Sequence, residues 1–156
     1  MEQMLAEANK DHVLAINLRN ELVEQLNIEP REVTERQLES VRTAIADALK
    51  KFEPLINHIP TNQIAESYLA LANFYEESIQ RDIHGRPADV TYYSDPSALY
   101  TEARRLSQFL ELTRKQVHTL EKSKKLCTNV DLKEIVSNQL NDALALYFIS
   151  ANQQFF

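Results

Sequence analysis

Hydrophobic residues recur along the chain in steps of three and four, which is the period of an α-helix with one buried face. The pattern predicts five helices, at about residues 3–27, 34–52, 61–82, 97–126 and from about 129 onward. The fourth has the most regular spacing, and its apolar positions are Leu99, Ala103, Leu106, Leu110, Thr113, Val117 and Leu120. Such spacing is typical of a coiled-coil seam. We therefore predict an all-α, single-domain bundle of about five helices with one long coiled-coil-like helix.

Proline and capping residues mark the expected helix boundaries. Pro30 ends the first helical pattern, and Pro54 removes a backbone donor at the end of the second. Thr34 is expected to cap the second helix, with Gln37 three residues later as its capping-box partner. The third helix carries a second apolar edge beside its main stripe, so we expect it to contact neighbours on more than one side.

The composition favours helices over sheets. The chain has one glycine, Gly85, in 156 residues, far below the usual share of about 7%. Hairpins and barrels use glycine in turns that need positive φ, whereas this single glycine is expected to end the third helix. The longest uncharged apolar run, residues 143–149, is far shorter than the roughly 20 residues that span a bilayer. We expect no signal peptide and no membrane partner, and the single cysteine, Cys127, favours a reducing, cytoplasmic location.

A segment of about 40 residues resembles one tetratricopeptide repeat. The matching positions are Tyr68, Leu71, Ala72 and Tyr75 in a first helix, and Tyr100 with Ala103 at the start of a second. The sequence holds no second copy, and such arrays need about three repeats to bury their core. We interpret the segment as two antiparallel helices that pack with small residues at their contact.

The sequence contains no motif for a metal, a cofactor or covalent catalysis. None of the four histidines follows a glutamate by three residues, and one cysteine cannot form a zinc-binding pair. A phosphate-binding loop needs several glycines, and no Gly-x-Ser-x-Gly elbow is present. His12 lies on an apolar stripe and is predicted to be a core-edge residue, while Cys127 is predicted to be a small buried residue. We therefore predict no metal, no cofactor and no catalytic residues.

Residues 103–125 form a basic segment in an acidic protein. They hold seven Lys and Arg side chains against two Glu, whereas the whole chain has a net charge of −6. Clustered basic residues are typical of phosphate binding, so a nucleic-acid interface is one interpretation. Most of these side chains lie opposite the apolar seam, however, and no aromatic residues are interleaved with them on that face. We therefore favour contact with an acidic face of another protein or of a second copy of this chain.

The connection expected at residues 82–96 is longer than the two to eight residues usual between bundle helices. It contains His84, Arg86, Tyr92 and Tyr93. Arginine offers forked hydrogen-bond donors, and tyrosine offers a large contact area with few rotatable bonds. We predict that these four residues bind a partner; a connection that only covers the end of the bundle is the alternative.

The sequence as a whole favours a non-enzymatic protein–protein interaction module, such as a small adaptor, regulator or assembly protein. Self-association is expected too, because Phe148, Phe155 and Phe156 lie near one chain end and exposed apolar patches usually mark interfaces. The first alternative is a nucleic-acid-associated regulator that uses residues 103–125. The second is a small all-helical ribonuclease-type enzyme, although the arginine and histidine residues of this chain stand closer together than in that class.

Overall fold

The computed structural model describes residues 2–58, 61–84 and 96–153, and every element in these ranges is a helix. The five long helices are α1 (Glu2–Ile28), α2 (Glu35–Phe52), α3 (Thr61–His84), α4 (Pro96–Leu126) and α5 (Val130–Gln153). Two short 3-10 helices, Pro30–Glu32 and Glu53–His58, follow α1 and α2. The predicted all-α fold with five main helices is confirmed.

The helix boundaries lie where the capping residues predict them. The backbone N–H of Gln37 donates to Thr34 Oγ1 at 3.2 Å, and the backbone N–H of Thr34 donates to Gln37 Oε1 at 2.8 Å. At the start of α5, Asn129 Oδ1 accepts a hydrogen bond from the backbone N–H of Leu132 at 3.0 Å. The first turn of a helix leaves backbone donors without partners, so these side chains determine where α2 and α5 begin.

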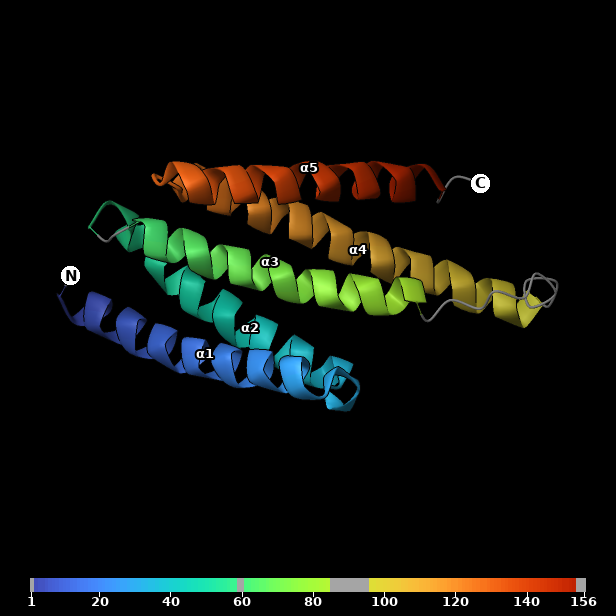
Figure 1. The fold of residues 1–156 in the computed structure, drawn as a ribbon, viewed down its shortest axis with the longest axis horizontal. Helices are drawn as coiled ribbons and strands as arrows, with labels where there is room; N and C mark the ends of the chain where they lie inside the picture. The colour runs from blue at the N-terminus through green and yellow to red at the C-terminus, as the bar shows by residue number, and fades with distance from the viewer. Residues whose placement is uncertain (1, 59–60, 85–95, 154–156) are drawn as a thin grey trace.

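The helices pack in the order in which they follow one another along the chain. The main contacts are α1 with α2, α2 with α3, α3 with α4 and α4 with α5, and the α3–α4 contact is the most extensive. Figure 1 shows the result: α3 crosses the middle of the molecule, with α1 and α2 on one side and α4 and α5 on the other. The helices therefore form a layered array in which α3 is the central member.

Buried apolar side chains gather in two clusters, one on each side of α3. The first core joins α1, α2 and α3 and includes Leu22, Leu38, Ile45, Leu49, Phe52, Ile64, Leu71 and Phe74. The second core joins α3, α4 and α5 and consists of Ala65, Ala72, Leu120, Cys127, Val136, Leu140 and Ala143. The expectation that the third helix contacts neighbours on more than one side is confirmed.

The contact between α3 and α4 is built from small residues. Ala65 and Ala72 are fully buried there, and Ser123 Oγ donates to the backbone carbonyl of Ala65 at 2.7 Å. A side chain as short as serine can reach the backbone of a neighbouring helix only when the two helices approach closely. The predicted contact through small residues is therefore confirmed for Ala72 of α3, whereas Ala103, the small residue named on the fourth helix, is exposed.

The coiled-coil-like seam predicted for the fourth helix does not coincide with the most buried face of α4. Thr113 and Leu120 of that seam are buried, but Ala103 is exposed. The buried face also includes positions outside the seam: Phe109, Gln116, Thr119 and Ser123. Because α4 packs against both α3 and α5, its buried surface is wider than a single seam.

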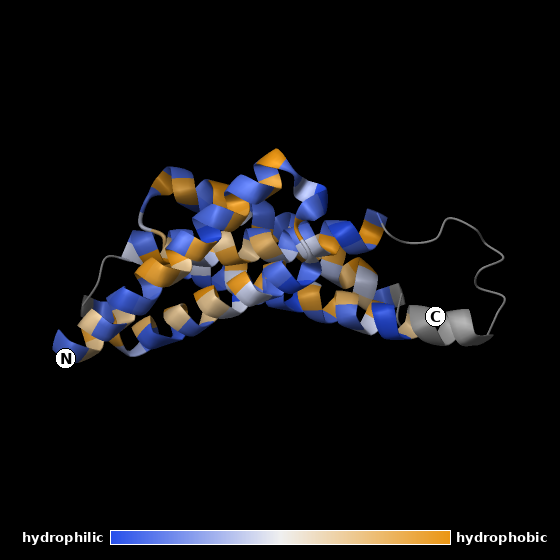
Figure 2. Ribbon diagram, turned by 90° about the horizontal axis from the view of Figure 1, so that it is seen from below, coloured by the Kyte–Doolittle hydropathy of each residue, from blue (hydrophilic) through white to orange (hydrophobic). Residues whose placement is uncertain are grey.

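The C-terminal part of α5 mixes buried and exposed side chains: Ala143 and Ser150 are buried, whereas the two apolar residues before Ser150 are exposed. Phe148 is 60% exposed and Ile149 is 57% exposed. Figure 2 shows hydrophobic and hydrophilic residues mixed along the helices. In the described ranges no helix combines the length and the apolar character needed to cross a membrane.

Candidate functional site

A groove runs along α3 between α2 and α4. These two helices pack little against each other, so the side of α3 that faces between them remains open. Two adjoining hollows of about 290 and 680 Å³ make up this groove. Its floor is formed by Tyr68, Leu71 and Tyr75 of α3, and we call it the basic groove.

Lysine residues from both walls line the basic groove. Lys50 of α2 and Lys115 of α4 line both hollows, and in the described part of the chain neither of them forms an ion pair. Arg114, His118 and Lys122 of α4 line the smaller hollow as well. Positive charge from two helices therefore meets in one hollow, and two of the cations are not held in an ion pair by any described residue.

Two tyrosines accompany these cations. Lys122 Nζ lies 5.7 Å from the centroid of the Tyr68 ring, and the guanidinium of Arg42 lies 5.1 Å from that of Tyr75. Both distances are within the range of cation–π attraction. Burial raises the pKa of both phenols, so the rings are neutral at pH 7 and their hydroxyl groups remain able to donate hydrogen bonds.

Acidic side chains also line the basic groove, mostly in its larger hollow. They are Glu39 and Asp47 of α2, Glu53 after α2, and Glu111 of α4. Arg114 donates to Glu111 at 2.5 Å, and this hydrogen bond lowers the pKa of the carboxyl group. Lys122 lies 3.3 Å from Glu53. The groove therefore has a basic end and an end of mixed charge.

A buried arginine joins the α2 wall of the basic groove to α3. Arg42 is only 7% exposed and donates to Ser78 Oγ and, at 3.4 Å, to the backbone carbonyl of Phe74. Ser78 in turn donates to Glu35 at 2.5 Å, and the guanidinium of Arg42 lies 3.5 Å from the same carboxylate. Because the charge of Arg42 is used in these contacts, this residue positions α2 rather than binding a ligand.

His12 packs against the first core and is buried more deeply than the core-edge position that its place on the apolar stripe predicted. The side chain is 4% exposed, its Nε2 lies 2.7 Å from Ser67 Oγ, and its ring meets the ring of Phe52 edge to face at 5.1 Å. Burial, and secondarily the charge of Arg19, lower its pKa. His12 is therefore neutral at pH 7 and connects α1 to α3.

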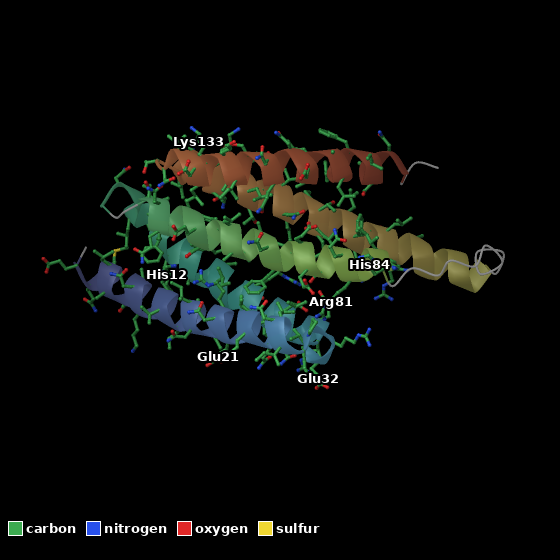
Figure 3. All side chains as sticks on the ribbon, in the orientation of Figure 1. His12, Glu21, Glu32, Arg81, His84 and Lys133 are labelled. Carbon is green, nitrogen blue, oxygen red and sulfur yellow. The ribbon has the colours of Figure 1, made fainter. Side chains whose placement is uncertain are left out.

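The predicted partner-binding residues fall partly within the described structure. His84 is exposed at the last position of α3, whereas Arg86, Tyr92 and Tyr93 lie outside the described residues. Figure 3 labels His12 toward one end of the molecule and Arg81 with His84 at the other end of α3. The role of these residues in binding stays a prediction.

The expected connection at residues 82–96 begins too early. Asp82 belongs to α3, where its carboxylate accepts a hydrogen bond from Arg105 Nε of α4 at 2.8 Å. Helix α3 continues to His84, the residue before Gly85, and α4 begins at Pro96. The helix therefore extends two residues beyond its predicted end at residue 82, and the pairing of Asp82 with α4 holds this end of α3 in place.

Arg81 is engaged by the protein itself. It donates to the backbone carbonyls of Val33 and, at 2.8 Å, Pro30, and its Nε lies 3.2 Å from the carboxylate of Glu77. These contacts attach the connection between α1 and α2 to the end of α3. Arg81 therefore has a structural role at the end of α3, next to the exposed His84.

Of the predicted interface residues, Phe148 is exposed on α5 and its ring contacts the ring of Tyr147 at 5.8 Å. Phe155 and Phe156 lie outside the described residues. Cys127 is buried, as predicted, and burial raises the pKa of its thiol. In the described ranges no three His, Cys, Asp or Glu side chains are grouped so that they could hold a metal ion.

Sequence reasoning missed the basic groove. The basic segment 103–125 has no aromatic residues interleaved on its solvent face, and the rings of the groove, Tyr68 and Tyr75, come from α3. Nothing in the sequence marks Lys50 as a binding residue, because it lies on α2 in an ordinary amphipathic pattern. Only the packing order of α2, α3 and α4 brings Lys50, Tyr75 and Lys115 together.

Comparison of the chain with models of protein families, with curated proteins and with solved structures finds no match.

Proposed function

We propose that the protein is a non-enzymatic protein–protein interaction module whose basic groove binds an acidic segment of a partner protein. Lys50 and Lys115 carry this proposal, because they line one groove from two different helices and have no ion-pair partners among the described residues. Carboxylates of a segment that lies in the groove can accept a charge-assisted hydrogen bond from each lysine. Leu71, with the rings of Tyr68 and Tyr75, gives the same segment an apolar floor to cover.

The charge pattern of the basic groove favours a protein over a nucleic acid. A phosphate backbone carries evenly spaced negative charges, and the mixed end of the groove presents Glu39, Asp47 and Glu111 to it. A peptide can instead place acidic residues at one end and neutral or basic residues at the other. Clustered basic residues are nevertheless typical of phosphate binding, and the half-buried ring of Tyr75 lies beside them, so a nucleic-acid-associated regulator is the alternative that the experiment must distinguish.

Self-association is the second part of the proposal. Phe148 and Ile149 are more than half exposed near the end of α5, and neighbouring exposed apolar side chains are typical of an interface. Sedimentation of the protein at micromolar concentration is expected to show a species heavier than the monomer. Detection of the monomer alone would remove self-association from the proposal without affecting the groove.

The groove proposal is tested by mapping ligand contacts on the isotope-labelled protein by nuclear magnetic resonance. The two ligands are a glutamate-rich peptide of about 15 residues, which as a helix matches the roughly 22 Å from Ser107 to Lys122 of α4, and a single-stranded oligonucleotide of equal charge. We expect the peptide to perturb residues of α2, α3 and α4 around Lys50, Tyr75 and Lys115. Tighter binding of the oligonucleotide would favour the nucleic-acid alternative, and absence of binding by both would contradict the proposal.

Two matched double variants show whether Lys50 and Lys115 are responsible for binding the peptide. Lys50→Glu with Lys115→Glu is expected to weaken peptide binding about tenfold or more, which corresponds to about 1.4 kcal/mol. Lys10→Glu with Lys133→Glu makes the same change in net charge at exposed positions outside the groove. This control variant should bind nearly as the natural chain does.

A further inference from the structure

A third hollow, of about 340 Å³, is bounded by α3, α4 and α5 and is separate from the basic groove. It differs from the basic groove in its chemistry, because amide and carboxylate side chains line it. They are Asn73, Glu76, Gln80, Gln116, Gln139 and Asp142, and we call this hollow the amide pocket. No lysine, arginine or histidine is among its lining residues.

Gln116 holds a hydrogen-bond acceptor that is not used. Its Nε2 donates to Glu76 Oε2 at 2.7 Å, and Gln80 Nε2 donates to Glu76 Oε1 at 2.8 Å. These contacts fix the orientation of the Gln116 amide, because the reverse orientation would place its oxygen against a carboxylate oxygen. Gln116 is only 5% exposed, and its buried Oε1 has no donor among the described residues. A buried acceptor without a donor is costly and needs a physical explanation.

The negative charge of the amide pocket is not compensated either. Glu76 is half-buried and accepts only from neutral amides, and Asp142 lines the same pocket from α5. In the described ranges no cationic side chain pairs with either carboxylate. Each carboxylate oxygen has two lone pairs, so Glu76 can accept further hydrogen bonds beside those from Gln80 and Gln116. The pocket therefore fits a group with a positive charge and several N–H donors.

Among such groups, a guanidinium fits these acceptors better than an ammonium or a metal ion. Its planar fork has five N–H donors that point in different directions and can donate to several acceptors at once, whereas an ammonium is a compact point charge. The described side chains offer no cluster that would hold a metal ion. We propose that the amide pocket binds a guanidinium group, either of a small compound such as agmatine or of an arginine side chain in a partner protein.

The experiment is a chemical-shift titration of the isotope-labelled full-length protein with two pairs of ligands. Agmatine is compared with putrescine, which has the same charge but carries an ammonium where agmatine has a guanidinium. A capped Ala-Arg-Ala peptide is compared with a capped Ala-Lys-Ala peptide. We expect saturable shifts around Asn73, Gln116 and Gln139 with at least one of the two guanidinium ligands, and at least tenfold weaker binding of its ammonium counterpart. Saturation by agmatine points to a small compound, and saturation by the arginine peptide alone points to a partner side chain.

Variants separate specific binding from attraction to an acidic surface. Glu76→Gln keeps the size of the side chain but removes its charge, and is expected to weaken guanidinium binding at least tenfold. Asp142→Asn alters an exposed residue on the rim, so it should weaken binding several-fold in a fully folded protein. Glu134→Gln removes an exposed charge from α5 outside the pocket and should leave affinity unchanged. Three outcomes would each overturn the proposal and leave water as the occupant of the pocket. They are equal affinity for guanidinium and ammonium ligands, equal effects of Asp142→Asn and Glu134→Gln on binding, and chemical shifts that do not saturate.

Discussion

The two cores on either side of α3 are built by different means. The first core fills its volume with large side chains, of which Leu38, Leu49 and Phe52 are almost completely buried. The α3–α4 contact that begins the second core relies on Ala65 and Ala72 together with buried hydroxyl groups. The first core is thus stabilised mainly by the burial of large apolar groups, whereas the second combines buried Leu120, Val136 and Leu140 with the close approach of α3 and α4.

The difference has a consequence for the basic groove, which lies where the two halves meet. Its α2 wall is positioned by the first core, its α4 wall by the second, and its floor belongs to the helix they share. The spacing between Lys50 and Lys115 therefore depends on both kinds of packing. The comparison is tested by substitutions that remove volume from the first core and add volume to the second.

The largest expected effect comes from emptying the first core. Phe52→Ala removes a ring that is 2% exposed and that contacts His12, and we expect it to lower the free energy of unfolding by roughly 3–5 kcal/mol. Urea denaturation measures this loss. The control is Leu18→Ala on α1, where the side chain is 44% exposed and where a loss below about 1 kcal/mol is expected. Similar losses for both variants would show that the first core does not depend on filled volume.

Overfilling the second core should have the next largest effect. Ala65→Leu adds three carbon atoms where α3 and α4 approach closely, and is expected to cost roughly 1–3 kcal/mol. Ala46→Leu makes the same change at a half-buried position that lines the basic groove, where space is available. If the two enlargements are tolerated equally in thermal unfolding, the account of close approach is wrong.

Loss of the hydrogen bond between α3 and α4 should lower the free energy of unfolding less than either change in core volume does. Ser123→Ala removes the hydroxyl that donates to the Ala65 carbonyl, and we expect a loss of about 1 kcal/mol. Thr119→Val is a useful comparison, because its hydroxyl donates at 2.7 Å to the Lys115 carbonyl within α4. If Thr119→Val lowers the free energy of unfolding as much as Ser123→Ala does, the hydrogen bond between α3 and α4 stabilises the protein no more than one within α4.

The smallest effect is the pH dependence that His12 gives to the first core. Its pKa is lowered in the folded state, so the folded protein binds a proton there less readily than the unfolded chain does. The stabilisation is complete above the ordinary value of 6.5 and is lost as the pH falls below that value toward the pKa of the folded state. Urea denaturation at pH 7.5 and 5.5 should show a decrease on the order of 1 kcal/mol or less. The decrease should become smaller in His12→Gln, and an unchanged pH dependence in that variant would assign it to other groups.

The sequence predicted the local structure well because local structure depends on neighbouring residues. The Thr34–Gln37 capping box and the stripe that contains Leu38, Ile45 and Phe52 formed as expected. Each of these features involves residues within a few positions of one another along one helix. The start of the fifth helix, expected at about residue 129, is also local, because Asn129 caps α5.

The sequence failed where the outcome depends on which helices become neighbours. The regular spacing of the fourth helix predicted a single seam, but α4 packs against two helices, and Phe109 and Gln116 are buried in addition. The basic groove was missed for the same reason, because Lys50 and Lys115 are 65 positions apart in the sequence. No pattern within a single helix reveals that α3 keeps these two lysines on opposite walls of one groove.

The central claim is that Lys50 and Lys115 bind an acidic segment. Its most direct test is a charge-reversal experiment in which binding is measured by fluorescence anisotropy. The natural chain and the Lys50→Glu, Lys115→Glu variant are each titrated with a labelled glutamate-rich peptide and with the same peptide carrying lysine at the glutamate positions. The account predicts that each protein prefers the peptide of opposite charge by about tenfold or more, and that the Lys10→Glu, Lys133→Glu control keeps the preference of the natural chain. A variant that continues to prefer the glutamate-rich peptide would contradict the account, because the binding site would then lie outside the basic groove.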